Sequence, residues 1–224
     1  MEHKFGAELN HLILRPVMED DLELLRQWRN SATISKYLRK IEYITSERQI
    51  VWYRDLLLNP DSYYWTITEK GKAIGALSIY NIADNVAEIG RIMIGDVSSQ
   101  GKGYGYKSLI MAMKIGFLLL QVKSYNLTVH KENNVALHIY QKTGFHERFQ
   151  INNENHENNE NNKDVELKMI INRQTYEEKN MMSNDIIVYS DIFNLIVPPP
   201  TSPKFYGDNL TATFKVFYEI LKVA

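Results

Sequence analysis

The chain has 224 residues, of which 44% are hydrophobic and 24% charged, so it can build a buried core and does not have the composition of a disordered chain. Its 26 basic and 27 acidic residues give a formal net charge of −1, which indicates no global nucleic-acid-binding surface. Cysteine is absent, which excludes disulfides, thiolate metal ligands and a cysteine nucleophile. Residues 1–10 lack the apolar core of a signal peptide and no apolar run could span a bilayer. We therefore expect a cytoplasmic protein that binds neither membrane nor nucleic acid.

The first part of the chain predicts two helices and four strands. Acidic residues crowd the first turn of the first helix, where they favour the positive end of the helix dipole. The last three strands are joined by short polar turns, which indicates an antiparallel meander. In chain order we expect a strand at 11–17, helices from Glu19 and from Thr45, and strands at 63–68, 74–82 and 88–95.

A polar, glycine-rich loop at 96–105 then introduces alternating helices and strands. This alternation implies one parallel pairing at the end of the antiparallel sheet. Residues 151–163 are rich in Asn and Glu, and because an alternating strand follows them, we expect a mobile hairpin connection inside one domain. The expected elements are helices at 106–120 and 133–142 and strands at 125–129, 145–149 and 165–171.

The character of the sequence changes again after Asn172. Residues 198–200 are three prolines that form a stiff spacer, and residues 211–222 have the spacing of an amphipathic helix. We therefore expect one domain at 1–172 and a C-terminal extension at 173–224. That extension could pack on the domain, mediate a homodimer or dock a partner.

The loop that carries the chemistry is Gln100-Gly101-Lys102-Gly103-Tyr104-Gly105. Its glycines allow a tight turn and a close approach to a ligand. The helix that follows leaves several N–H groups without intrahelical partners, and these donors favour phosphate oxygens. The spacing fits neither a P-loop, because Tyr106 stands where that motif needs glycine before Lys107-Ser108, nor a Gly-x-Gly-x-x-Gly fingerprint.

Two motifs in order resemble the GNAT acyltransferase superfamily. Gln100-x-x-Gly103-x-Gly105 resembles its pyrophosphate loop for acetyl-coenzyme A. Asn133-x-x-Ala136-x-x-x-Tyr140-x-x-x-Gly144-Phe145 resembles its second conserved block. Upstream, Leu14-Arg15-Pro16 and the acidic helix with Trp28 are similar to the start of the group that acts on protein N-termini, aminoglycosides, polyamines and amino sugars. The resemblance covers residues from about 10 to 171.

The resemblance implies an α/β (α+β) fold with a mixed, mostly antiparallel sheet, helices on both faces and one splayed parallel strand pair. The pantetheine arm of acetyl-CoA would lie in that gap, where backbone groups of Met93 and Ile94 would bind the arm and polarise the thioester. The residues that the resemblance assigns to acetyl-CoA are Ile92, Met93, Ile94, Gln100, Gly101, Lys102, Gly103, Tyr104, Gly105, Tyr106 and Asn133.

Two catalytic residues are implied, each with a structural alternative. Tyr140 matches the tyrosine that protonates the departing thiolate, and otherwise it packs its ring in the short helix. Glu88 stands where relatives carry a glutamate that removes the amine proton, and otherwise it is a solvated carboxylate of the strand. Asn133 could contact the coenzyme, cap its helix, or both. The spacing of His130, His138 and His146 matches no metal motif, so we expect no metal.

The predicted activity is direct transfer of an acetyl group from acetyl-CoA to a primary amine of a small molecule or a peptide N-terminus. A covalent acyl-enzyme is not expected, because there is no cysteine and no serine–histidine motif. Polyamines or aminoglycosides, protein N-termini and amino sugars stay open as acceptors. The competing interpretation is a non-catalytic acyl-CoA-binding or protein-interaction module with the same fold.

Overall fold

The computed structural model describes residues 4–36, 42–153, 164–180 and 184–190. The strands are β1 (Gly6–Leu9), β2 (Leu12–Pro16), β3 (Tyr63–Glu69), β4 (Lys72–Ala83), β5 (Val86–Ile94), β6 (Ser124–His130), β7 (His146–Asn153), β8 (Asp164–Asn172) and β9 (Ile187–Tyr189). The helices are η1 (Glu19–Asp21), α1 (Leu22–Asn30), α2 (Ala32–Ser35), α3 (Ser46–Leu58), η2 (Val97–Ser99), α4 (Tyr104–Leu119), α5 (Asn134–Thr143) and α6 (Arg173–Lys179). Every strand and helix predicted before residue 172 is present, with shifts of a few residues at the ends.

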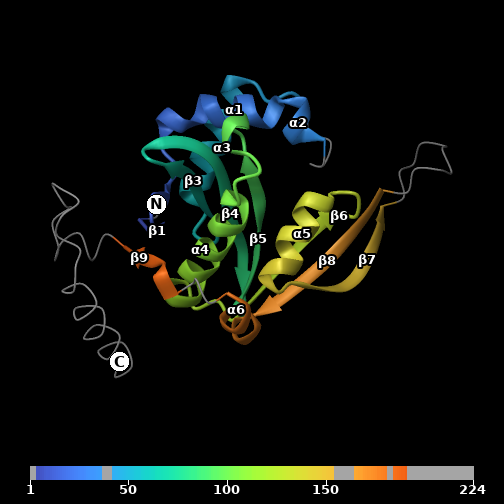
Figure 1. Cartoon of the computed structure of the whole chain (residues 1–224). Coiled ribbons are helices and arrows are strands. Elements are labelled where there is room, and N and C mark those ends of the chain that lie inside the picture. The colour runs from blue at the N-terminus through green and yellow to red at the C-terminus, as the bar shows by residue number, and fades with distance from the viewer. Residues whose placement is uncertain (1–3, 37–41, 154–163, 181–183, 191–224) are drawn as a thin grey trace, which may run out of the picture. The chain divides into compact units, whose positions relative to one another are not determined.

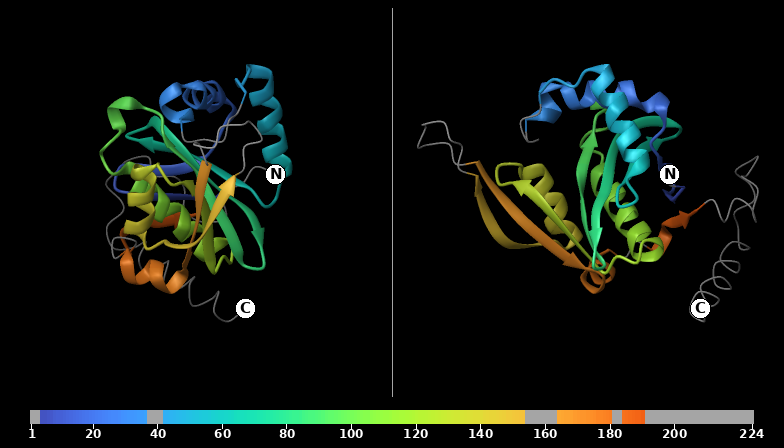
Figure 2. Two further views of the ribbon diagram at one scale, coloured as in Figure 1. Left: turned by 90° about the vertical axis from the view of Figure 1, so that its right-hand side faces the viewer. Right: turned by 180° about the vertical axis from the view of Figure 1, so that it is seen from behind.

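These strands form one mixed sheet in the order β7-β8-β6-β5-β4-β3-β2-β1-β9 (Figures 1 and 2). The β5–β6 pair is parallel, as predicted, and its neighbours pair antiparallel. The sequence placed the parallel pair at the end of the sheet, and this was wrong. The reason is that β8 pairs along the whole free edge of β6 and β7 then pairs with β8, which moves the parallel pair inside the sheet.

Helices cover both faces of the sheet (Figure 2). Because strand side chains alternate between faces, β3 sends Trp65 and Ile67 to the α4 side and Tyr64 to the other side. On that second side Tyr64 packs with Leu22 and Leu25 of α1 and with residues of α3. The alternation of side chains along β3 therefore supplies apolar residues to the helices on both faces.

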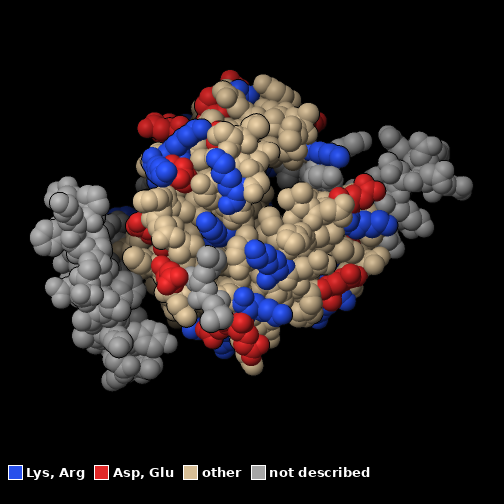
Figure 3. All heavy atoms as spheres, viewed as in Figure 1, with Lys and Arg blue, Asp and Glu red and all other residues tan. Residues whose placement is uncertain are grey.

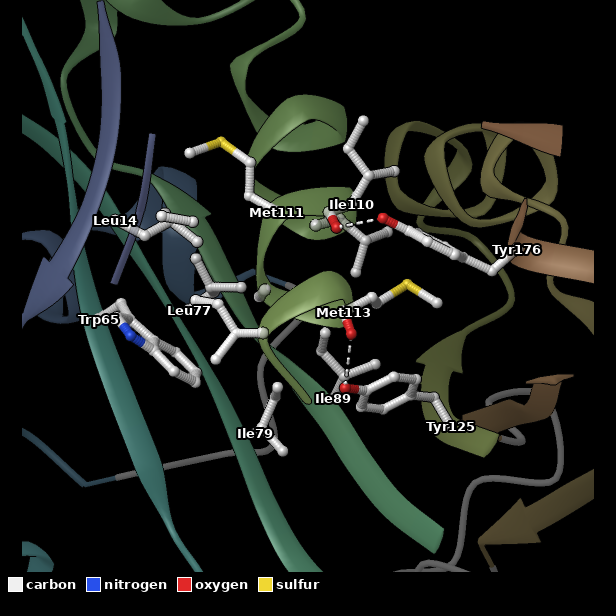
Figure 4. Packing of buried hydrophobic residues seen from close by; sticks show 14 of the residues in the cluster. Leu14, Trp65, Leu77, Ile79, Ile89, Ile110, Met111, Met113, Tyr125 and Tyr176 are labelled. Carbon is white, nitrogen blue, oxygen red and sulfur yellow. Dashed lines mark hydrogen bonds between the residues drawn. The ribbon is translucent and has the colours of Figure 1, made fainter. Parts of the chain in front are cut away.

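Helix α4 is the centre of the larger core (Figure 4). Its Ile110, Met111 and Met113 are fully buried and belong to one cluster with strand residues such as Leu77. Gly116 of this helix has a packing reason, because a Cβ there would lie 1.7 Å from the hydroxyl oxygen of Tyr125. The missing side chain lets that tyrosine approach α4.

The folded unit extends past the predicted boundary after Asn172. Asn172 caps α6 by accepting from the Thr175 N–H at 2.8 Å, and β9 adds to the sheet by pairing with β1. All described elements belong to one unit that runs to Tyr189. Neither α6, β9 nor β1 was predicted, because each is too short to show a periodicity of its own. The proline run at 198–200 and the predicted helix at 211–222 lie outside the described residues.

Two further expectations concern connections and membranes. β7 and β8 pair antiparallel, so the Asn-rich segment does connect two strands of one hairpin. Residues 154–163 of that segment lie outside the described residues. No helix in the described ranges has the length and apolarity needed to cross a membrane.

Candidate active site

The loop from β5 to α4 is held at its base by short hydrogen bonds. The Asp96 carboxylate accepts from Lys72 Nζ at 2.8 Å and from the hydroxyls of Ser98 and Ser99 at 2.6 Å each. These bonds hold the pKa of Asp96 well below its usual range. The Gln100 amide then donates to the carbonyl oxygen of Ile94 at 2.9 Å. Gln100 therefore ties the loop back to the end of β5.

The loop itself presents a row of free backbone donors. Gly101 and Gly103 have φ angles of 72° and 76°, which only glycine adopts without strain. The first intrahelical bond of α4 runs from the Lys107 N–H to the Gly103 carbonyl. Within the described structure, none of the N–H groups of Gly101–Tyr106 donates to a backbone carbonyl. This row of donors at the positive end of a 16-residue helix suits the oxygens of a pyrophosphate.

Side chains add positive charge around this row. Lys102 is exposed at the turn, and the Lys107 ammonium lies 5.8 Å from the ring centre of Tyr104. The Lys142 ammonium of α5 lies 4.5 Å from the ring centre of Tyr106. Figure 3 shows basic side chains over α4 and α5 on the face that it presents. The electrostatics of the loop therefore favour a polyanion.

Tyr106 is held by the segment that follows the predicted domain boundary. Its hydroxyl donates to the Asn180 Oδ1 atom at 2.8 Å. The amide of Asn180, which is 1% exposed, donates to the carbonyls of Thr143 and Tyr176. The hydroxyl proton of Tyr106 is therefore already used within the fold, whereas its backbone N–H is not. Sequence reasoning missed Asn180 because it lies outside both motifs.

The parallel strands β5 and β6 separate directly after Glu88. Pairing between β5 and β6 covers three positions and ends at Glu88 opposite Asn126, although β5 continues to Ile94 and β6 to His130. Figures 1 and 2 show β5 and the β6–β8–β7 part of the sheet diverging from a shared end. Figure 3 shows a hollow between the parts of the surface over these two halves. The predicted splay is thus confirmed.

The predicted coenzyme-binding strand residues lie along that unpaired edge. Met93 and Ile94 pair with β4 on the other side, opposite Ala76 and Gly75. The Met93 side chain is 7% exposed and packs toward α1, whereas Ile92 and Ile94 pack against the α4 core. Their backbone edge toward β6 has no strand partner. This edge leads from the glycine-rich loop down to the parting point at Glu88.

The two predicted catalytic side chains differ in burial. Tyr140 is 8% exposed and packs edge-on against Phe145 with ring centres 5.8 Å apart, and its hydroxyl forms no hydrogen bond with another described residue. Burial, with a smaller contribution from the nearby Tyr80 phenol, raises the pKa of Tyr140 well above its usual value. Glu88 is half-buried and its carboxylate lies 3.8 Å from Lys168 Nζ of β8. The sequence had not indicated that cation.

Asn133 caps α5. Its side-chain oxygen accepts from the Ala136 N–H at 3.2 Å, which satisfies one free donor of the helix. The capping role that the sequence left open is therefore present, and a contact with the coenzyme stays a prediction. No set of three or more His, Asp or Glu side chains in the described ranges is arranged to hold a metal ion.

Comparison with known proteins agrees with this geometry. The family profile described as "Acetyltransferase (GNAT) domain" matches residues 11–146. The chain belongs to the GNAT acetyltransferase family. It is an acetyl-CoA-dependent N-acetyltransferase, so the principal functional prediction is confirmed, and the non-catalytic alternative is the weaker interpretation.

Individual relatives are distant. The chain is 27% identical over 132 residues to the spermidine N(1)-acetyltransferase of Escherichia coli K12, which covers 59% of this chain and 71% of the relative. It is 26% identical over 125 residues to the acetyltransferase PseH of Campylobacter jejuni, covering 56% and 76%.

Solved structures show the same fold at low identity. The spermidine N-acetyltransferase of Vibrio cholerae in complex with CoA and spermine has a TM-score of 0.68 and 23% identity over 75% of this chain and 99% of that chain. RimJ of Mycobacterium smegmatis in complex with CoA-disulfide has a TM-score of 0.65 and 17% identity over 78% and 90%. These similarities extend to the GNAT fold and not to the acceptor.

Proposed function

We propose that the gap between β5 and β6 binds acetyl-CoA, with its pyrophosphate on the N–H groups of Gly101–Tyr106 and its pantetheine arm along Ile92, Met93 and Ile94. The observation that carries this assignment is the row of unpaired donors, which stands at one end of an unpaired strand edge. Gln100 supports the row by anchoring the loop to Ile94. Lys102, Tyr104 and Asn133 border the same site.

The acceptor nitrogen would attack the thioester carbon directly. A C–N bond forms, the C–S bond breaks, the sulfur takes a proton, and the nitrogen loses one. Tyr140 is assigned as the acid, because its raised pKa keeps the phenol protonated. A backbone N–H of β5 would polarise the carbonyl.

Glu88 is assigned as the group that receives the amine proton, directly or through water. An alkyl amine of pKa about 10.4 is neutral in only about one molecule in 2,500 at pH 7, a cost near 4.6 kcal/mol, so a proton acceptor beside it helps. The position of Glu88 at the parting of the strands supports this role. The acceptor class that we propose is a primary amine of a small molecule or peptide. A homodimer and a cytoplasmic location stay predictions.

Isothermal calorimetry with acetyl-CoA tests the loop assignment. We expect the wild-type chain to bind and Gly103→Glu to lose binding, because the new carboxylate would stand among the phosphate donors. Gly71→Glu is the matched control: Gly71 has a φ of 79° in the β3–β4 turn and, like Gly103, has open space at its Cβ position. Equal loss in both variants, or no wild-type binding at millimolar acetyl-CoA, would contradict the assignment.

A further inference from the structure

Two arginines on the sheet face opposite α4 form no ion pair with another described residue. Arg29 belongs to α1, which packs on Tyr64 and Met93 in the smaller core cluster. Arg91 belongs to β5, three residues beyond the point where β5 leaves β6. Both therefore lie near the open part of the sheet, on the side away from the helix that carries the pyrophosphate loop.

A β-bulge sets the direction of Arg91. Between Ala76 and Ser78 of β4 the partners on β5 step from Met93 to Gly90, so β5 carries one extra residue. Arg91 sits in this bulge with a φ of 53°, a conformation that non-glycine residues adopt at a cost. A backbone outlier of this kind beside a ligand gap points to a functional constraint on the side chain.

The Arg91 guanidinium is held on the face that carries Glu88. It lies 4.2 Å from the ring centre of Tyr80, which pairs directly with Glu88 across β4 and β5. The Tyr80 ring in turn leans over Gly90, where an added Cβ would lie 3.3 Å from its hydroxyl oxygen. Cross-strand partners share a face of the sheet, so the cation and the proposed proton acceptor face the same side.

Arg29 reaches the same face from the helix above it. Its Nε atom is buried and has no hydrogen-bond partner among the described residues, which is costly for a cationic donor. The charges of Arg29 and Arg91 both act on the buried phenol of Tyr64 and oppose the rise in its pKa that burial causes. Tyr64 pairs with Ser78, and Ser78 with Gly90, so one row across three strands connects the surroundings of both arginines.

Two carboxylates of the neighbouring elements, Glu88 and Asp21, already have cationic partners. Glu88 faces Lys168 at 3.8 Å. Asp21 at the start of α1 accepts two hydrogen bonds from Arg15, at 2.6 and 2.7 Å. Each of these two pairs has no net charge, so Arg29 and Arg91 leave an excess of positive charge beside the point where β5 and β6 separate.

We propose that the acceptor amine carries an anionic group, a carboxylate or a phosphate, that Arg29 and Arg91 bind while Glu88 faces the amine. This inference rests on the proposed function and names the acceptor class for the same site. Guanidinium groups suit both anions because their N–H donors match two acceptor oxygens at once. A polyamine would bring further positive charge to a face that already has an excess, so the inference separates this chain from its spermidine-acetylating relatives.

Initial-rate measurements with matched amines test the proposal. One pair compares glucosamine 6-phosphate with glucosamine, a second compares alanine with alaninamide, and spermidine is the polycationic acceptor. We expect kcat/KM to be about 10- to 100-fold higher for the anionic member of at least one pair. The pair that shows the preference identifies phosphate or carboxylate as the anion. Arg29→Gln and Arg91→Gln should reduce that preference at least about tenfold.

Arg148→Gln is the control variant, since it removes one positive charge from an exposed position on β7 and should preserve the preference. A preference for spermidine, or an equal effect of all three substitutions on every amine, would overturn the proposal. Acetyl-CoA calorimetry runs beside the assay, so a failure of the coenzyme site is recognised separately. If acetyl-CoA binds and no amine reacts, binding of glucosamine 6-phosphate and of alanine to the CoA-bound protein is measured by calorimetry. If neither compound binds in a way that depends on Arg91, the inference is overturned.

Discussion

At the scale of single residues, the environment of a side chain decides its chemical role. Tyr140 and Tyr125 are both buried tyrosines of the α4 side of the sheet, yet their hydroxyls differ. The Tyr125 hydroxyl donates to the Met113 carbonyl at 3.1 Å (Figure 4), whereas that of Tyr140 has no partner among the described residues. A hydroxyl that takes no part in the hydrogen bonds within the fold is available to a ligand.

The substitution Tyr140→Phe should separate catalysis from packing. We expect kcat to fall about 100-fold because the thiolate loses its proton donor. The KM for acetyl-CoA and the free energy of unfolding should change little, because the ring and its contact with Phe145 remain.

The matched substitution is Tyr125→Phe, which should cost about 1 kcal/mol of stability and leave kcat unchanged. Steady-state kinetics and urea unfolding of both variants provide the comparison. An unchanged kcat in Tyr140→Phe would return this residue to a packing role.

At the scale of elements, α1 is attached to the sheet through one carboxylate. Asp21 is 6% exposed and accepts from Arg15, from the Met18 N–H at 2.9 Å and from the Thr66 hydroxyl at 2.8 Å. The acidic run that the sequence explained by the helix dipole thus contains one residue with a tertiary role. Burial alone would raise the pKa of Asp21, but the bonds from Arg15, Met18 and Thr66 outweigh it and lower the pKa.

The substitution Asp21→Asn should weaken this attachment in a pH-dependent way. At pH 7 we expect a loss of about 3 kcal/mol, because Arg15 keeps its charge without a counter-ion. The folded pKa of Asp21 lies below its unfolded value, so the carboxylate stabilises the fold fully above about pH 4 and loses this effect as the pH falls through the folded pKa. The difference between wild type and variant should therefore shrink below about pH 4.

Urea unfolding at pH 7 and at several lower pH values measures this difference. Asp20→Asn is the control, since Asp20 is exposed in the same short helix and its substitution should change stability by less than about 0.5 kcal/mol. A loss at pH 7 that persists unchanged at low pH would show that the carboxylate charge is not what attaches α1.

At the scale of the whole molecule, the segment after Asn172 completes the fold. The Tyr176 hydroxyl donates to the Ile110 carbonyl of α4 at 2.8 Å (Figure 4), and Lys114 of α4 donates to the Ile186 carbonyl at 3.0 Å. Tyr176, Ile186 and Val188 are each at most 4% exposed. The segment therefore closes the core around the helix whose N-terminus carries the glycine-rich loop.

Truncation tests this conclusion. In a chain that ends at Asn172, the free energy of unfolding should fall by about 5 kcal/mol or more, because three large apolar side chains and their hydrogen bonds are removed. A loss of this size approaches the whole stability of a typical domain. A chain that ends at Ser190 keeps all of these contacts and should retain the thermal midpoint and acetyl-CoA affinity of the full chain. Circular dichroism melting and calorimetry measure both. Equal midpoints for the two truncations would contradict the completing role.

Local patterns in the sequence were sufficient for much of the fold and for the glycine-rich loop. Short polar turns predicted the antiparallel meander, and the glycine spacing of Gln100–Gly105 predicted a loop whose donors stay free. These features depend on neighbours in the chain, so one sequence contains them. The assignment of Tyr140 and Glu88 needed more, namely the resemblance to a family, because a lone tyrosine or glutamate has no local pattern.

Only the tertiary structure decided which distant residues meet. It placed Lys168 beside Glu88, Asn180 beside Tyr106, and Arg15 beside Asp21. In each case the two residues belong to different segments of the chain. It also paired β9 with β1, although the two strands lie near opposite ends of the domain in the sequence. The physical reason is that such contacts are selected by the burial of the sheet faces as a whole, and no window of sequence carries that information. The sequence by itself therefore determined the family, the glycine-rich loop and the order of the elements, whereas the charges that lie beside the parting of β5 and β6 were decided by the folded chain.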